Sequence, residues 1–235
     1  MIETIDLCKV FGESDESKFY ANKDINIKIN DNELLVILGP SGSGKSTFMN
    51  LLSTLEKPTS GKILYDGRDI SKLKGSKLTK FRKEEIGFIF QQYHLISMLT
   101  VYENIEIAAQ LSSNDKNFIY KLIEEVSLKG KENKYPFQLS GGEQQRVAIA
   151  RAIAKTPKVL FCDEPTGALD EENSKKILKL ICKVQKEHGI TIIMVTHNPL
   201  IADVADRVIC MNSGKIISDK LNEVKKDVDE LEWNL

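Results

Sequence analysis

The sequence lacks the features that mark membrane-spanning and nucleic-acid-binding chains. Its longest apolar runs, such as Leu34–Leu38 and Ile192–Val195, are only a few residues long, whereas a membrane-spanning helix needs about 20 apolar residues. Lys plus Arg number 33 and Asp plus Glu number 34, for a net charge of -1. No excess of positive charge is present to bind nucleic acid or anionic lipid by counterion release. We therefore expect no direct membrane insertion and no nucleic-acid partner.

Signals for export and for a disulfide or metal framework are also missing. The first residues include Glu3 and Asp6, where a secretory signal would be basic and then apolar. The four cysteines form no CxxC pair and no cluster with histidine, a pattern typical of buried thiols in a reducing compartment. We therefore expect a cytosolic protein.

The composition is that of an ordinary globular protein. Hydrophobic residues make up 41% and charged residues 29% of the chain, which excludes a disordered or low-complexity polymer. No internal repeat occurs, and no linker rich in Gly, Ser or Pro divides the chain. At 235 residues we expect one large domain, or one domain that carries a smaller lobe.

Hydrophobic periodicity changes twice along the chain. Alternation with a period of two predicts strands in the first part, and the run Leu34–Leu38 predicts a strand buried on both faces. These early strands are expected at Ile2–Val10, Tyr20–Ile29, Leu34–Leu38, Lys62–Tyr65 and Ile86–Phe90. From Val101 to Ala154 the period becomes 3.6, which predicts a helical lobe.

After the helical lobe the order strand, helix, strand predicts a parallel sheet. The expected elements are strand Val159–Cys162, helix Glu172–Glu187, strand Thr191–Val195, a short helix from Pro199, and a hairpin of Arg207–Met211 with Lys215–Ile217. The last stretch, Asp219–Leu235, is charged and sparse in apolar residues. A solvated helix or a frayed tail is expected there.

A glycine-rich loop follows the buried strand directly and matches G-x-x-x-x-G-K-[ST]. It consists of Gly39, Pro40, Ser41, Gly42, Ser43, Gly44, Lys45, Ser46 and Thr47. In such a loop, backbone N–H groups converge on phosphate oxygens and the N-terminus of the next helix adds positive charge. Lys45 supplies a full charge, and Ser46 is expected to ligate Mg²⁺. The loop therefore predicts nucleotide binding.

Two acidic residues, Asp163 and Glu164, end the apolar strand that begins at Val159. Side chains alternate along a strand, so the two carboxylates point in different directions and are suited to different tasks. Asp163 is placed to hold Mg²⁺, and Glu164 to polarise an attacking water. Acidic residues are also common in turns after strands, so this interpretation depends on the glycine-rich loop.

Ser140 and Glu143 form the S-x-x-E pattern ahead of an apolar helical run, which predicts a capping box. Gly141 and Gly142 would then lie at an exposed helix N-terminus with unpaired N–H donors. Two interpretations remain open from these residues alone. The segment is either a well-capped helix or an anion site.

Taken together, these motifs resemble the nucleotide-binding subunit of ATP-binding cassette transporters over nearly the whole chain. The markers stand in the family's order: the Walker A loop 39–47, Gln91 of the Q-loop, the signature 139–143, Asp163 with Glu164, the D-loop 168–170, and His197. The resemblance implies an α/β P-loop NTPase core with a mostly parallel sheet, an N-terminal antiparallel β subdomain and an inserted helical subdomain. The implied ranges are 1–90 and 156–218 for the core with its β subdomain, 91–155 for the helical subdomain, and 219–235 for a tail.

The resemblance also implies residue roles, with ATP and Mg²⁺ as cofactors. Glu164, His197 and Gln91 would be catalytic, and Ser46, Gln91 and Asp163 would bind the metal. Phe11 would stack on adenine, where the family usually has tyrosine, and Asp170 would link two sites. Ser140, Gly141, Gly142 and Glu143 would close on the γ-phosphate held by a second subunit. Glu143 stands where the family usually has glutamine, and it adds negative charge there unless its carboxylate turns back to the cap.

These implications predict an ATPase subunit that dimerises on ATP, expected to pair with a second copy of itself, and that powers a separate transmembrane permease through residues 91–104. It would lie on the cytoplasmic face of the membrane through that permease. Residues 90–96 and 166–168 resemble the branch serving macrolide export, lipoprotein release and bacitracin-type peptide resistance. A regulatory ATPase of the cell-division type would share every motif. A soluble cassette acting on ribosomes or DNA would usually carry two cassettes or a long coiled coil, and this chain has neither.

Overall fold

The computed structural model describes residues 1–12, 17–112 and 115–232. Its strands are β1 Ile2–Phe11, β2 Phe19–Ile29, β3 Leu34–Leu38, β4 Ser60–Tyr65, β5 Arg68–Asp69, β6 Ile86–Ile89, β7 Val159–Asp163, β8 Thr191–Val195, β9 Arg207–Asn212 and β10 Lys215–Leu221. Within the described residues they form a four-stranded sheet in the order β2-β1-β4-β5 and a six-stranded sheet in the order β10-β9-β3-β8-β7-β6. The helices are α1 Lys45–Leu52, α2 Gly75–Glu85, α3 Val101–Ala109, α4 Lys116–Glu125, α5 Gly141–Ile153 and α6 Glu171–His188.

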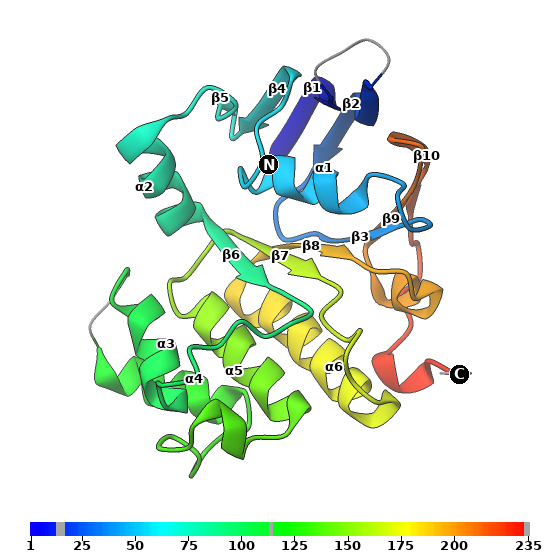
Figure 1. Cartoon of the computed structure of the whole chain (residues 1–235). Helices are drawn as coiled ribbons and strands as arrows, with labels where there is room; N and C mark the ends of the chain where they lie inside the picture. Colours follow the sequence, from blue (N-terminus) through cyan, green and yellow to red (C-terminus); the bar gives the residue numbers. More distant parts are fainter. Residues whose placement is uncertain (13–16, 113–114, 233–235) are drawn as a thin grey trace.

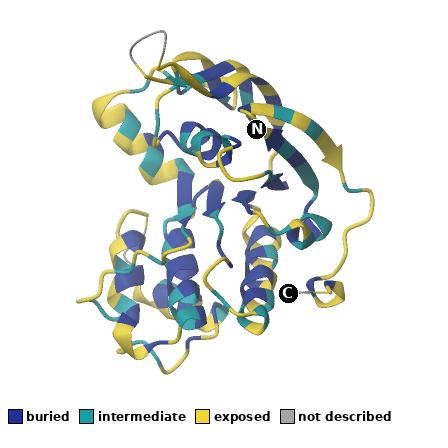
Figure 2. Cartoon of the chain, turned by 45° about the vertical axis from the view of Figure 1, so that its right-hand side comes forward, coloured by how far each residue is buried: buried dark blue, intermediate teal, exposed yellow. Residues whose placement is uncertain are grey.

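The six-stranded sheet lies across the middle of the molecule, with α1 on one side and α3 to α6 on the other (Figure 1). Its central strands are buried on both faces, as the apolar run at β3 predicted. Leu34 and Val36 pack into the core shared with α3 to α6, whereas Leu35 and Ile37 pack into the core shared with α1 and the smaller sheet. The buried residues accordingly line both sides of the sheet (Figure 2).

Parallel pairing brings the ends of three strands to one edge of the sheet. β3 pairs in parallel with β8 and β9, and β7 pairs in parallel with β6 and β8. The register sets Ile37 beside Val195 and Asp163 beside Val195. The predicted, mostly parallel sheet is therefore confirmed, with β10 antiparallel to β9. Ligand sites of open α/β sheets lie at this carboxyl edge.

The helical lobe predicted between Val101 and Ala154 is confirmed as α3, α4 and α5. Helix α2, which follows β5, was not predicted from the sequence. In α2 only Phe81 is buried, where its ring meets the Tyr65 ring edge-on at 5.0 Å between centroids. A helix that buries one side chain has no apolar stripe, and periodicity therefore does not reveal it. Within the described ranges no helix is both long enough and apolar enough to span a bilayer.

The expectation of a solvated helix or frayed tail after Asp219 is wrong for the described part of that segment. β10 continues to Leu221, and a single 3₁₀ turn, η3, spans Val228–Glu230. Val228 and Leu231 are buried in the core that contains α6. The two apolar side chains were too few to produce a periodic signal, yet they anchor the segment. Residues 233–235 of the predicted tail lie outside the described residues.

This anchoring yields a stability prediction. Leu231→Ala removes buried methyl groups from a side chain that is 3% exposed, so we expect the free energy of unfolding to fall by about 2 kcal/mol. Urea unfolding followed by circular dichroism measures the loss. Val224→Ala is the matched control, because Val224 lies in the same segment and is 86% exposed. Equal midpoints for the two variants would mean that the segment is not anchored.

Candidate active site

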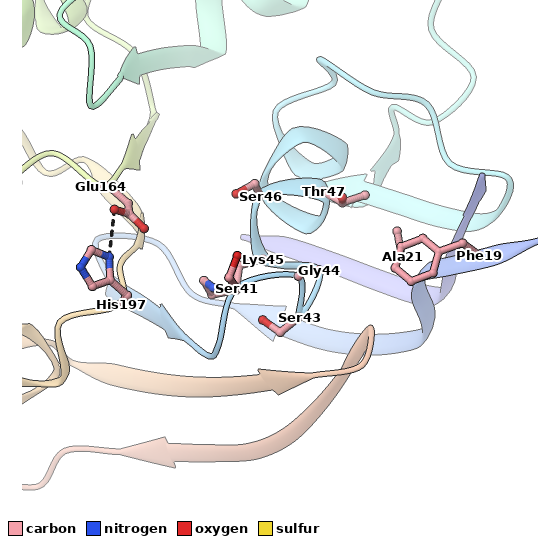
Figure 3. Close-up of a pocket in the computed structure, with 11 residues that line it drawn as sticks. Phe19, Ala21, Ser41, Ser43, Gly44, Lys45, Ser46, Thr47, Glu164 and His197 are labelled. Atoms are coloured by element: carbon pink, nitrogen blue, oxygen red, sulfur yellow. Dashed lines mark ion pairs between the residues drawn. The ribbon is translucent and has the colours of Figure 1, made fainter. Parts of the chain in front are cut away.

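An open cavity of about 490 Å³ lies at the carboxyl edge of the six-stranded sheet. Its lining comes from β2, the glycine-rich loop, and the ends of β7 and β8: Phe19, Ala21, Ser41, Gly42, Ser43, Gly44, Lys45, Ser46, Thr47, Glu164 and His197. Phe19 and Ala21 lie at one end, and Glu164 and His197 lie at the other, with the glycine-rich loop between them (Figure 3). The cavity therefore has two chemically different ends joined by a phosphate-binding loop.

Gly44 makes the turn from the glycine-rich loop into α1. It is the N-cap of α1 with a φ of 97°, in the left-handed region that favours glycine. A Cβ added here would lie 2.2 Å from the carbonyl oxygen of Ala21, so any other residue would collide with β2. A glycine has no side chain to cap the helix, and the first N–H groups of α1 remain available to an anion.

Lys45 is held in the wall of the cavity although it is charged. The residue is 7% exposed, and its ammonium donates hydrogen bonds to the carbonyl oxygens of Gly39 at 2.8 Å and Pro40 at 2.9 Å. Nearby, the buried hydroxyl oxygen of Ser43 has no hydrogen-bond partner among the described residues. A buried cation and an unpaired hydroxyl beside free helix N–H groups are what a phosphate chain would satisfy.

Asp163 ends β7, half-buried beside the cavity. Burial and the charge of Glu164 raise the pKa of Asp163 above its ordinary value, and Lys45 partly opposes this. A carboxylate in this position gains from a cation placed against it. Ser46, which follows Lys45 and lines the cavity, offers a second hard oxygen. Oxygen ligands of this kind, together with substrate phosphates, are what Mg²⁺ prefers.

The raised pKa of Asp163 predicts a pH-dependent cost in stability. The folded state binds this proton more tightly than the unfolded state, so stability falls as pH rises from the ordinary value of 3.8 through the raised pKa. Above that pH range the full loss of folding stability is present. Asp163→Asn should therefore unfold at a higher urea concentration than wild type at neutral pH, and the difference should shrink as the pH is lowered through the range. A variant less stable than wild type at neutral pH would contradict this.

Glu164 leaves the line of β7 and turns toward the cavity. Its backbone N–H still donates to Val195 at 2.9 Å, but its φ is 46°, an uncommon value for a residue other than glycine. The carboxylate meets Nδ1 of His197 at 2.9 Å (Figure 3). Backbone strain of this kind is typical of functional sites. The predicted acid and the predicted histidine are thus direct neighbours.

Gln91 lies outside the cavity lining but next to its acid. A Cβ added to Gly167 would lie 2.9 Å from Nε2 of Gln91 and 3.1 Å from Oε2 of Glu164. Both side chains therefore border the same glycine. The structure brings Gln91, Glu164 and His197, the three residues predicted to be catalytic, into one group.

The capping box at α5 is confirmed. Ser140 is the N-cap, its N–H donates to Oε2 of Glu143 at 2.8 Å, and the N–H of Glu143 donates to the Ser140 hydroxyl oxygen. The helix N-terminus predicted to be exposed is only partly so, because Ser140 is exposed, Gly141 is half-buried and Gly142 is buried. A Cβ on Gly142 would lie 2.6 Å from Oδ1 of Asn173, because α6 packs against this turn.

The residues 140–143, here called the signature tip, do not reach the nucleotide cavity of the same chain. Ser140 and Glu143 instead border a second cavity of about 580 Å³ between α5 and α6. Asp170 lies close to the tip, since it caps α6 by accepting the N–H of Asn173 at 2.8 Å. Asn173 in turn covers Gly142. Asp170 and the tip therefore form one group, separate from the glycine-rich loop.

The aromatic residue in the cavity is Phe19 rather than Phe11. Phe11 is 42% exposed, and the ammonium of Lys9 lies 4.8 Å from its ring centroid. The two phenylalanines are partners across β1 and β2. Stacking of adenine on Phe11 stays a prediction. Phe19 was not among the residues predicted for the site, because its pairing with Phe11 is a contact between two strands that no local sequence pattern records.

The fold and the loop together define a P-loop nucleoside triphosphatase. Comparison with known proteins specifies the family: the profile described as "ABC transporter" matches residues 22–167. The chain is 45% identical over 221 residues to the uncharacterized ABC transporter ATP-binding protein MJ1508 of Methanocaldococcus jannaschii, covering 92% of this chain and 98% of that protein. The chain therefore belongs to the ATP-binding cassette transporter family and is an ATP-binding, ATP-hydrolysing subunit.

Two further similarities bear on assembly. The macrolide export ATP-binding/permease protein MacB of Haemophilus ducreyi is 43% identical over 207 residues, which cover 86% of this chain but 30% of MacB. Among solved structures, the dimeric post-hydrolysis state of the ATP-binding cassette MJ0796 bound to ADP and Pi superposes with a TM-score of 0.84 at 36% identity. That match covers 94% of this chain and 98% of the other.

Proposed function

We propose that two copies of this chain bind ATP and Mg²⁺ at two shared sites and drive a separate membrane permease. Each site would combine the glycine-rich loop of one copy with the signature tip of the other. The observation that carries this proposal is the separation of the two motifs within one chain, where they border different cavities. A two-fold dimer pairs each motif with its complement, and the similar cassette MJ0796 is described as dimeric.

ATP would lie along the cavity, with its base toward Phe19 and its terminal phosphate toward Glu164. The N–H groups of the glycine-rich loop and the ammonium of Lys45 would bind the phosphates. The Glu164 carboxylate would accept a proton from the attacking water, and it is held in place by His197 at 2.9 Å. His197, at the same end of the cavity, would contact the γ-phosphate. Gln91 would orient the water beside Glu164.

Mg²⁺ would fit the oxygen donors of Asp163 and Ser46, and Gln91, which borders Gly167 beside Glu164, is the third predicted ligand. When bound, the ion neutralises charge that develops on the phosphates. Asp163 would hold the ion as a carboxylate, because a nearby cation favours the ionised form of Asp163 over the protonated form. Glu164 is left free for the proton transfer, because its neighbour Asp163 leaves the strand in another direction.

The permease would contact the segment that follows Gln91. Ile96 and Met98 in this segment are 42% and 84% exposed. The same segment is tied to α5, because Arg151 donates to the carbonyl oxygens of Tyr93 at 3.0 Å and His94 at 2.7 Å. Movement of the signature tip on ATP binding would therefore be passed along α5 to the permease contact. We place the chain on the cytoplasmic face of the membrane, bound there through its permease.

The transported substrate would be a peptide, a lipoprotein or a drug-like molecule, and export is the direction suggested by the similarity to MacB. A regulatory role of the cell-division type, without solute transport, would use the same site. Reconstitution of the permease complex in vesicles separates the two: substrate accumulation that depends on ATP supports transport, and its absence with full ATP turnover supports the regulatory role.

Mixing two defective variants tests the shared site. Lys45→Ala breaks the glycine-rich loop, and Ser140→Arg blocks the signature tip. Each protein alone should be nearly inactive. In a mixed dimer, the intact loop of one variant meets the intact tip of the other, which restores one of the two sites. Because random pairing makes about half of the dimers mixed, ATP turnover should return to about a quarter of the wild-type value. Wild-type turnover by the Ser140→Arg protein alone would overturn the proposal.

A further inference from the structure

Glu143 in the signature tip has an ion-pair partner that lies outside the motif. One carboxylate oxygen, Oε2, accepts the N–H of Ser140 at 2.8 Å. The other, Oε1, pairs with the ammonium of Lys131. Lys131 belongs to the loop between α4 and α5, where its N–H donates to the carbonyl oxygen of Leu128 at 3.0 Å. Both oxygens of the carboxylate are thus engaged, one by the cap and the other by Lys131.

The charge of Glu143 has two opposite consequences. A carboxylate in the first turn stabilises α5 through the helix dipole. The same charge opposes a phosphate that approaches the same helix N-terminus. Lys131 and Ser140 hold the pKa of Glu143 below its ordinary value, so the carboxylate stays ionised. A neighbouring cation would reduce the repulsion between this charge and the phosphate.

Other charged groups near Glu143 do not take this role. Arg146 lies one turn further along α5 and is half-buried. Its charge interacts with that of Glu143 at a distance, but within the described residues no salt bridge joins the two side chains. Lys176 and Lys179, which line the same cavity, are paired with Glu172 and Asp229. Lys131 is the cation in direct contact with the carboxylate.

We propose that Lys131 is a positioning residue of the signature tip: it locks the Glu143 carboxylate into the cap and neutralises it, so that the tip accepts the γ-phosphate held by a second subunit. The proposal rests on the shared nucleotide site proposed above. It has a specific consequence. Lys131 is needed because residue 143 is glutamate, and a neutral glutamine at that position would remove the need.

The test measures ATP-induced dimerisation in the Glu164→Gln background by analytical ultracentrifugation. Lys131→Met should raise the ATP concentration needed for half-maximal dimer by about tenfold, because two equivalent tips each lose their charge balance. The double variant Lys131→Met with Glu143→Gln should return to within about threefold of the parent. Lys129→Met is the matched control, since Lys129 pairs with Glu124 in the same loop region and should dimerise like the parent.

The double variant distinguishes charge balance from a structural role. A loop that merely collapses without Lys131 would not be rescued by a change at residue 143. The proposal is overturned if Lys131→Met dimerises like the parent, or if the double variant stays as defective as Lys131→Met. A parent that shows no dimer with ATP would instead contradict the shared site itself. Calorimetry measures ADP binding by each variant as a single chain, and normal binding shows that the variant is folded.

Discussion

Glu164→Gln protein is expected to hydrolyse ATP at least about a hundredfold more slowly than wild type, while its ATP affinity is retained. A general base contributes on the order of 10² to 10⁴ in rate, and an amide of the same shape does not accept the proton. The carboxylate of Glu164 is aimed at the cavity by a left-handed backbone, with a φ of 46°, and by its contact with His197. Phosphate release under saturating ATP and Mg²⁺ measures the effect.

Two further variants test whether the effect is specific to Glu164. Glu172→Gln makes the same chemical change in the first turn of α6, where the acid forms an ion pair with Lys176, and should leave turnover near wild type. His197→Ala removes the partner of Glu164 but keeps the base, so its loss should be smaller than that of Glu164→Gln. Undiminished hydrolysis by the Glu164→Gln protein would remove Glu164 from the mechanism.

Lys45→Ala is expected to weaken ATP binding by at least about a hundredfold. The substitution removes the charge that sits buried in the cavity wall, where charge-assisted bonds to phosphate are strongest. It also frees the carbonyl oxygens of Gly39 and Pro40, which Lys45 holds in the loop. Isothermal titration calorimetry measures the affinity.

The control for Lys45→Ala is Lys57→Ala. Lys57 is an exposed lysine next to Glu56, outside the cavity, and its loss should leave ATP affinity unchanged. A circular dichroism spectrum equal to that of wild type shows that the Lys45→Ala chain is folded. Normal ATP affinity in the Lys45→Ala protein would contradict the assignment of the glycine-rich loop as the phosphate site.

Local patterns predicted the parts of the fold and site that depend on neighbouring residues. The glycine-rich loop, the acids at the end of β7 and the capping box at Ser140 are each set within a few residues of sequence, and the structure places them at the predicted strand and helix ends. Burial on both faces of β3 followed from its continuous apolar run. These local patterns predict the observed structure because tertiary packing favours the same local conformations.

Contacts between distant segments were not predicted from the sequence. Asn173 covers Gly142 because α6 packs against α5, and Lys131 pairs with Glu143 across a loop. Phe19 lines the cavity and is the partner of Phe11 across β1 and β2. The buried Leu231 joins a core built from α6. Each depends on how elements pack, and no local period or motif records that packing.

The most direct test of the shared site is the mass of the Glu164→Gln protein in solution, measured by sedimentation velocity with and without ATP and Mg²⁺. A single chain has a mass of 26.5 kDa. The account predicts a species of twice that mass when ATP and Mg²⁺ are present, and its return to the single-chain mass when Ser140 is also changed to arginine. A single-chain mass under all conditions, together with wild-type turnover that is independent of protein concentration, would contradict it.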